Sequence, residues 1–220
     1  MSTVIIGCKT LENELLRAMS ECGCTYDVKW VKSGLHNTPN KLTEALQDVL
    51  DSLAGNSSRV IMAIGYCGNA LVGLRTGDIT LIIPRVDDCI SLLLGSYKNK
   101  CEHVKDNNAY FITEGWLRGE RNIWCEYKYT INKYGEETGS KIFEAMFGNY
   151  KTLTILDTGC FDIPSIMGEV KAIADTLKLD HKVVPATIAY IKNLLTGPWN
   201  HTSFLVIPPQ SVISQADLQL

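Results

Sequence analysis

Runs of apolar and β-branched residues alternate along this chain with amphipathic segments, and this alternation limits the folds that it can adopt. The runs cover residues 3–7, 26–31, 59–64, 79–83, 110–113, 152–156, 182–185 and 203–207. Between them, apolar residues recur at helical spacing; in 39–53, for example, they fall on one face of a helix before Gly55. Strands that alternate with helices are typical of an α/β fold with a mainly parallel sheet and helices on both faces.

The alternation also predicts how the chain is organised. The pattern in residues 1–113 predicts an N-terminal α/β half, and the pattern in residues 151–220 predicts a C-terminal α/β half. Residues 114–150 are polar and aromatic, with a helical pattern broken at Gly135 and Gly139, so we expect a helical connection there. We therefore predict two Rossmann-like halves joined by a helical segment, an arrangement that could also form one continuous domain.

The charge of the chain is nearly balanced, which narrows the classes of partner. Lys and Arg number 21 and Asp and Glu number 24, giving a formal net charge of −3. Without a basic surface, neither a nucleic acid nor an anionic membrane is expected as a partner. No apolar run approaches the roughly 20 residues of a membrane span, and the first residues lack a signal-peptide pattern. We expect a cytoplasmic protein with reduced cysteines, and an oligomer is compatible with the sequence.

Four of the eight cysteines directly follow predicted strands. Cys8, Cys67, Cys89 and Cys160 each lie at a turn that leads from a strand towards a helix. In a parallel sheet the carboxyl ends of the strands meet at one edge, where ligands collect. We therefore expect several thiols to line one edge of the sheet.

Three explanations of these thiols remain open. Cys8, Cys67 and Cys89 could hold a metal, because thiolates suit zinc and iron-sulfur clusters and three ligands leave one position for substrate. Alternatively, Cys67 and Cys160, one in each half, resemble the two-thiol arrangement of amino-acid racemases such as those for aspartate and glutamate. In the third explanation, the cysteines are small apolar residues that pack tight turns and carry no chemistry.

The segment IPRVDDC adds charged candidates beside one of these thiols. Asp87 and Asp88 precede the helix that begins near Cys89, and either could cap it. The second carboxylate could orient Arg85, bind a ligand group or act as a general base. We expect Arg85 to bind an anionic group of the substrate, and Asp88 or the loop residue His36 to move a proton.

Four segments of the chain resemble a known family. They read GLHNTP, YCGNALVGL, IPRVDDCISLLLGS and FITEGW, and in this order they resemble the domain of unknown function 1638. That family occurs in anaerobic archaea and bacteria, often beside corrinoid-dependent methyltransferase systems, which implies a methyl-transfer or corrinoid context. The resemblance points to Cys8, His36, Cys67, Gly68, Asn69, Arg85, Asp87, Asp88, Cys89, Gly95 and Trp116.

The thiols and the resemblance together lead to one functional hypothesis and two alternatives. We expect a metal-dependent enzyme of anaerobic one-carbon and methyl-transfer metabolism that acts on a small anionic substrate. Its metal would be a 4Fe-4S cluster or, next in order, zinc; a corrinoid is a further candidate cofactor. The expected metal ligands are Cys8, Cys67 and Cys89, and the expected cofactor-binding residues are Gly68, Asn69 and Trp116. The alternatives are a non-catalytic accessory that binds a corrinoid or a corrinoid protein, and a metal-free two-cysteine enzyme of the racemase type. A corrinoid protein or a methyltransferase is also a candidate partner of the enzyme.

Overall fold

Two β-sheets form the frame of the structure, a computed structural model that describes residues 2–220 apart from the side chains of 105–107. The first sheet has the order β2 (Asp27–Val31), β1 (Ser2–Cys8), β3 (Ser57–Ala63), β4 (Thr80–Pro84) and β8 (Phe204–Ile207). The second has the order β5 (Ala109–Ile112), β6 (Thr152–Asp157) and β7 (Asp180–Pro185). Neighbouring strands are parallel except β4 and β8. The predicted α/β class with mainly parallel sheets is confirmed.

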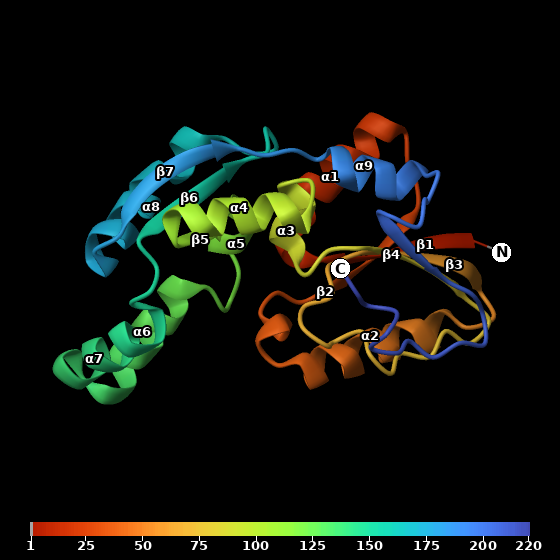
Figure 1. Cartoon of the computed structure of the whole chain (residues 1–220), viewed down its shortest axis with the longest axis horizontal. Coiled ribbons are helices and arrows are strands. Elements are labelled where there is room, and N and C mark those ends of the chain that lie inside the picture. Colours follow the sequence, from red (N-terminus) through yellow and green to blue (C-terminus); the bar gives the residue numbers. More distant parts are fainter. Residues whose placement is uncertain (1) are drawn as a thin grey trace.

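Helices cover both faces of the first sheet, and together they form what we call the first lobe. Figure 1 shows α1 (Glu12–Cys22) and α9 (Ala189–Thr196) on one face and α2 (Pro39–Leu53) on the other. The central strands β1 and β3 are apolar and buried along most of their length, as expected for strands covered on both faces. In α2, which follows Thr38 with a proline in its first turn, Leu42, Leu46 and Leu50 are buried.

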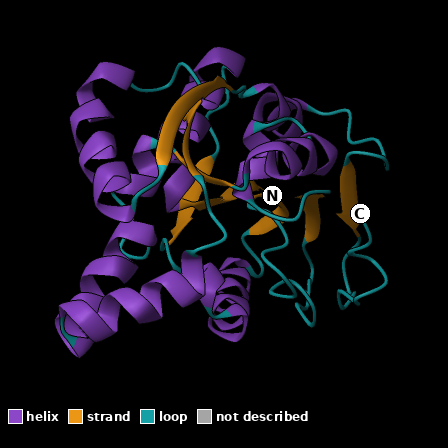
Figure 2. Ribbon diagram, turned by 60° about the vertical axis from the view of Figure 1, so that its left-hand side comes forward, coloured by secondary structure: helices purple, strands orange, loops and turns teal. Residues whose placement is uncertain are grey.

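The second sheet and the helices around it form the second lobe. These helices are α4 (Tyr97–Asn107), α5 (Glu114–Leu117), α6 (Ile123–Tyr134), α7 (Glu136–Phe147) and α8 (Ile163–Leu177), and the turned view in Figure 2 shows helices on both sides of the strands. The predicted helical segment corresponds to α5, α6 and α7. Gly135 separates α6 from α7, as expected, whereas Gly139 lies inside α7. A Cβ atom at Gly139 would lie 3.0 Å from the Ile131 Cα, so the glycine allows α7 to approach α6 closely.

The chain crosses between the lobes and returns, which differs from the predicted division into consecutive halves. β5 precedes residue 113 but pairs with β6 in the second sheet. β8 and α9 follow residue 151 but belong to the first lobe, where β8 pairs with β4 and α9 packs against α1. The antiparallel β8 covers the edge of β4 that would otherwise offer unpaired backbone groups.

Among the helices of the described residues, none is long and apolar enough to cross a membrane.

Candidate functional site

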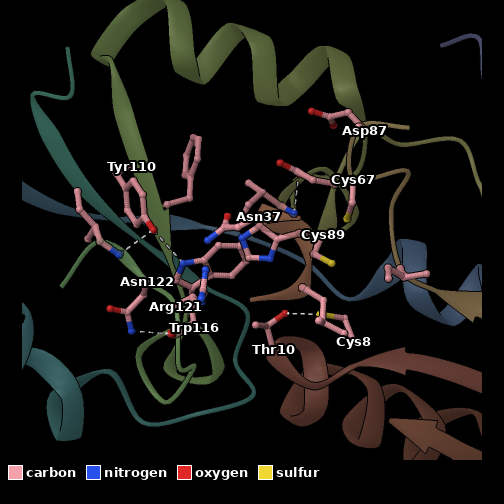
Figure 3. Close-up of a pocket in the computed structure, with 18 of the residues that line it drawn as sticks. Cys8, Thr10, Asn37, Cys67, Asp87, Cys89, Tyr110, Trp116, Arg121 and Asn122 are labelled. Carbon is pink, nitrogen blue, oxygen red and sulfur yellow. Dashed lines mark hydrogen bonds between the residues drawn. The ribbon is translucent and has the colours of Figure 1, made fainter. Parts of the chain in front are cut away.

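A cavity of about 600 Å³ lies between the two lobes (Figure 3). The first lobe contributes the turns after β1, β3 and β4 and the short helix η2 (Leu35–Asn37). The second lobe contributes residues of α4, β5, α5 and α6. This volume lies within the range of about 300–1,000 Å³ that is typical of small-molecule sites.

Two strand-end turns of the first lobe pack tightly against each other, and this contact places two of the thiols. The backbone N–H of Cys67 donates a hydrogen bond to the carbonyl oxygen of Asp87 at 2.7 Å. A Cβ atom at Gly65 would lie 2.4 Å from the Asp88 Cα, so only a glycine allows this approach. Cys67 itself has a positive φ of 48°, which is uncommon for a residue with a side chain. The turn after β3 is therefore held by backbone contacts against the turn that leads to Cys89.

Cys8, Cys67 and Cys89 meet at this side of the cavity, which we call the thiol wall. In Figure 3 the Cys89 sulfur lies between those of Cys67 and Cys8, so that the three sulfurs form a row. Cys8 also interacts with Thr10, whose Oγ1 lies 2.9 Å from the Cys8 Sγ. The structure thus brings together the three cysteines that the sequence placed at three different strand ends.

The thiol wall disfavours thiolates in the absence of a compensating cation. A hydrogen bond from Cys8 to Cys89, followed by burial, raises the pKa of Cys8 well above its usual range. A hydrogen bond to Cys67, followed by burial, raises the pKa of Cys89 in the same direction, although Cys8 opposes this shift. Both thiols are therefore protonated at neutral pH unless a bound cation stabilises the charged form.

The three cysteines fit a metal by their chemistry and proximity, but they do not surround a single point. Among the described residues, no group of three or more His, Cys, Asp or Glu side chains is arranged to hold a metal ion as it stands. Thiols are nevertheless the donors that zinc and iron-sulfur clusters take. Because the sulfurs form a row, a shared metal requires the outer side chains of Cys8 and Cys67 to turn towards a common centre.

The two carboxylates of the DDC segment hold the helix that begins with Cys89. Asp88 caps α3 (Cys89–Leu93), with its Oδ1 accepting hydrogen bonds from the backbone N–H groups of Ile90 and Ser91 at 3.0 and 3.2 Å. This confirms that one of the two aspartates is a helix cap. Asp87 accepts a hydrogen bond from the Ser91 hydroxyl instead.

Lys100 of α4 neutralises both carboxylates. Its Nζ lies 2.5 Å from Asp87 Oδ2 and also contacts Asp88, and the lysine side chain is only 17% exposed. Burial by itself would lower the pKa of Lys100, but the two carboxylates outweigh burial and raise it. All three residues line the cavity. The Asp88 carboxylate therefore already binds a lysine and the first turn of a helix. It would have to keep these partners while it moved a proton, as we predicted for it.

His36 and Trp116 both line the cavity, as the sequence predicted for a site residue, and they contact each other. Their ring centroids lie 5.4 Å apart with an interplanar angle of 33°. Burial lowers the pKa of His36, although Asp88 partly opposes this effect. The imidazole is thus neutral at pH 7, so one ring nitrogen can accept a proton while the other donates a hydrogen bond.

Trp116 belongs to a group of five aromatic side chains on the opposite side of the cavity, which we call the aromatic wall. Its members are Tyr110, Phe111, Trp116, Phe147 and Tyr150. The Trp116 Nε1 donates a hydrogen bond to the Tyr110 hydroxyl at 3.2 Å, and the rings of Tyr110 and Tyr150 meet edge to face. All five residues come from the second lobe.

Arg85 lies outside the set of residues that line the cavity. Its Nη1 donates hydrogen bonds to the backbone carbonyls of Gln219 at 3.0 Å and Asp217 at 3.4 Å. The guanidinium therefore ties the C-terminal segment to the end of β4. For Arg85 to bind an anion, as we predicted, the C-terminal segment would have to move away from the guanidinium.

Two further candidates also lie apart from the cavity-lining residues. Gly68 lines the cavity, but its exposed neighbour Asn69 does not, and the Asn69 carbonyl accepts a hydrogen bond from the Val72 N–H. The Cys160 thiol donates to the Thr158 carbonyl at 3.5 Å beside α1 of the first lobe. A racemase-type reaction would need Cys67 and Cys160 to face one substrate, and only Cys67 faces this cavity.

Sequence reasoning missed the basic residues of the cavity, which are Lys32, Lys100 and Arg121. None of them lies in a local motif. Lys100 reaches its partners from 12 and 13 residues away, on a different helix. No local pattern in the segment LRGERN singles out Arg121, whose direct neighbour in the sequence is Glu120.

Comparison with known proteins gives one match. No curated protein and no solved structure matches the chain. A family model, described as "Protein of unknown function (DUF1638)", matches residues 30–195. This range contains His36, Cys67, Cys89 and Trp116, whereas Cys8 precedes it. Because the match covers well over half of the sequence, the chain belongs to the DUF1638 family.

Proposed function

We propose that this protein is a metal-dependent enzyme of anaerobic one-carbon metabolism, whose metal is held by Cys8, Cys67 and Cys89 and whose small anionic substrate binds in the cavity between the lobes. The row of three thiols is the observation that carries this proposal. The thiols come from three strand ends that lie far apart in the sequence, and they meet where a ligand can reach them.

The thiol wall offers the donor atoms that a metal takes, and a bound metal would have to displace their protons. Without a cation, neighbouring thiols and burial raise the pKa values of Cys8 and Cys89 and keep both groups protonated. When bound there, zinc or an iron-sulfur cluster would keep the sulfurs deprotonated and offer an open coordination position to a substrate group. Binding would release protons, so the affinity for metal should rise with pH.

The protein's own residues have separate tasks in this proposal. Asp88 caps the helix that carries Cys89, and Lys100 fixes Asp88 from the second lobe, so together they orient the thiol. His36, neutral at pH 7, holds or accepts a proton beside the substrate. The rings of the aromatic wall give the side of the cavity opposite the thiols an apolar surface.

Metal and acid-labile sulfide analysis of protein purified without oxygen tests the proposal. We expect bound iron and sulfide, or zinc, in the wild-type chain. Cys67→Ser and Cys89→Ser should each lose most of the metal, and Cys8→Ser should lose metal as well. Cys22→Ser is the matched control, because Cys22 ends α1 and is not among the cavity-lining residues. Full metal content in Cys89→Ser would show that the shared site does not exist.

The one-carbon context rests on family resemblance rather than on geometry, and it needs its own experiment. The anaerobically purified protein is mixed with a cobalamin, and the visible spectrum of the corrinoid is recorded. A metal-bound protein that leaves the spectrum unchanged agrees with the enzyme. A metal-free protein that shifts the spectrum would replace the enzyme by the corrinoid-binding accessory.

A further inference from the structure

Arg121 is a cation at the mouth of the cavity that lacks an acidic partner within the described side chains. It lines the cavity, and Figure 3 shows it beside Trp116. None of the ion pairs between described residues includes it. Glu126 also lines the cavity but makes no ion pair with Arg121 in this part of the chain.

The surrounding structure holds Arg121 at a defined place. The buried side chain of Asn122 donates hydrogen bonds to the carbonyls of Trp116, Leu117 and Gly119 at 3.1, 3.1 and 3.2 Å, which closes the turn before α6. On the other side of the arginine, a Cβ atom at Gly34 would lie 2.8 Å from the Arg121 Cβ. The glycine, which has a φ of 83°, thus leaves room for the arginine stem against the first lobe.

Apart from Lys32, the other basic groups near the cavity are already engaged or neutral. Lys100 is paired with two aspartates, and Arg85 is bound to the C-terminal segment. The pKa of His36 is lowered by burial. Lys32 is exposed at the rim and is the second cation available to a ligand. Arg121 and Lys32 are therefore the cations of the cavity lining that remain available to an anion.

The aromatic wall determines what the rest of the ligand can be. It lies on the same side as Arg121 and presents rings, including the edge-to-face pair of Tyr110 and Tyr150. Rings of this kind favour an apolar or aromatic body over a highly hydrated one. A guanidinium favours a carboxylate, sulfonate or phosphate group, which it can bind through two parallel hydrogen bonds.

We propose that Arg121 binds the acid group of an organic anion whose apolar body lies along the aromatic wall and points towards the thiols. This inference rests on the proposed function and deepens it, because it names the class of substrate and the residue that selects it. Arg121 takes the place that Arg85 was expected to fill.

Two fluorescent probes of similar shape test the inference. Anilinonaphthalene sulfonate carries an anionic group on an apolar body, whereas N-phenylnaphthylamine has a similar body without the charge. Each probe is titrated against the full-length protein, and dissociation constants are obtained from the fluorescence increase. We expect Arg121→Gln to weaken the anionic probe about tenfold and to change the neutral probe by less than about twofold.

Matched variants separate charge recognition from general damage. Arg118→Gln, three residues away and paired with Glu114, should leave both constants unchanged. Arg121→Lys should retain part of the preference for the anionic probe, because the charge remains while the paired donors are lost. Equal weakening of both probes in Arg121→Gln would overturn the inference, and so would failure of the anionic probe to bind the wild-type protein.

A competition binding experiment on the wild-type protein tests the inference even if the variants do not fold. Benzoate should displace the anionic probe at concentrations at which benzyl alcohol does not, and equal displacement would overturn the inference. The result is independent of the metal site: loss of metal from the cysteine variants tests the proposed function, whereas metal content in Arg121→Gln should equal that of the wild type. A failure of the proposed function and a failure of the Arg121 inference can therefore be told apart.

Discussion

The two walls of the cavity come from different lobes and are positioned in different ways. The thiol wall lies on turns that directly follow buried strands, and backbone contacts such as Cys67 N–H to Asp87 O hold those turns together. The aromatic wall lies partly on the helical connection, where one side chain, Asn122, closes the turn that carries Trp116 and Arg121. The reactive groups are thus placed by the backbone of a sheet, and the groups that we propose to recognise the ligand are placed by side chains.

Gly65→Ala should have the largest effect, because it acts on the backbone contact of the thiol wall. The added Cβ would lie 2.4 Å from the Asp88 Cα, so the backbone of one of the two turns would have to shift. We expect a loss of about 3 kcal/mol or more in the free energy of unfolding, measured by urea denaturation.

The control for this substitution is Gly168→Ala in α8. A Cβ atom there meets no atom within 4 Å, and the exchange should stabilise the helix by about 0.5–1 kcal/mol. If Gly65→Ala were as stable as the wild type, the thiol wall would not depend on the close packing of its turns.

Lys100→Met tests the ion pairs that connect the two lobes beside the cavity. It leaves Asp87 and Asp88 side by side without their shared cation, so we expect a loss of about 1–3 kcal/mol in unfolding free energy, reduced from fully buried values because the carboxylates are partly exposed. Lys98→Met, on the exposed side of the same helix, should change stability by less than about 0.5 kcal/mol. Equal stability of the two variants would mean that solvent already screens the pairs.

Asn122→Ala tests how the residues of the aromatic wall are positioned. The substitution removes the cap of α6 and the donor to three carbonyls, which should cost about 1–2 kcal/mol. Binding of the anionic probe should weaken as well, while the metal content stays unchanged. A parallel loss of metal in this variant would show that the two walls are not positioned independently.

Glu14→Gln should give the smallest effect, and its sign depends on pH. Glu14 of α1 is fully buried, its Oε1 accepts a hydrogen bond from Thr158 of the second lobe, and its Oε2 has no partner among the described residues. Burial raises the pKa of Glu14. Its contribution to stability is therefore complete at low pH, below the unfolded pKa, and is lost as the pH rises through the folded pKa.

We therefore expect Glu14→Gln to be more stable than the wild type at neutral pH by about 1 kcal/mol. The difference should disappear near about pH 3, where the carboxyl is protonated in both the folded and unfolded states. Chemical denaturation at both pH values measures this. A variant less stable than the wild type at neutral pH would indicate that the charged carboxylate has a role in joining the lobes.

Local sequence patterns predicted the elements of this fold well, because strands and helices differ in the spacing of apolar residues. The convergence of Cys8, Cys67 and Cys89 was also predictable, since parallel strands bring their carboxyl ends to one edge. The place of β8 was not, because a short apolar strand does not specify which edge it will cover. For the same reason the sequence placed β8 in a separate C-terminal half.

The charged partners could not be predicted from local patterns. Arg85 sits two residues before Asp87, which suggested a shared role, but its guanidinium contacts residues more than 130 positions later in the chain. Arg121 belongs to no motif, and its proposed role follows from its place at the cavity, where no ion pair among the described residues includes it.

The return of the chain to the first lobe has a consequence for how the protein is made. During synthesis, β1 to β4 emerge early, but the edge of β4 stays uncovered until β8 has been translated. The second sheet, with all three strands between residues 109 and 185, can be completed sooner. The nascent chain thus passes through a stage in which the second sheet is complete but the first sheet still lacks β8. Truncation after β7 would make that stage permanent and leave an edge strand free to pair with other chains.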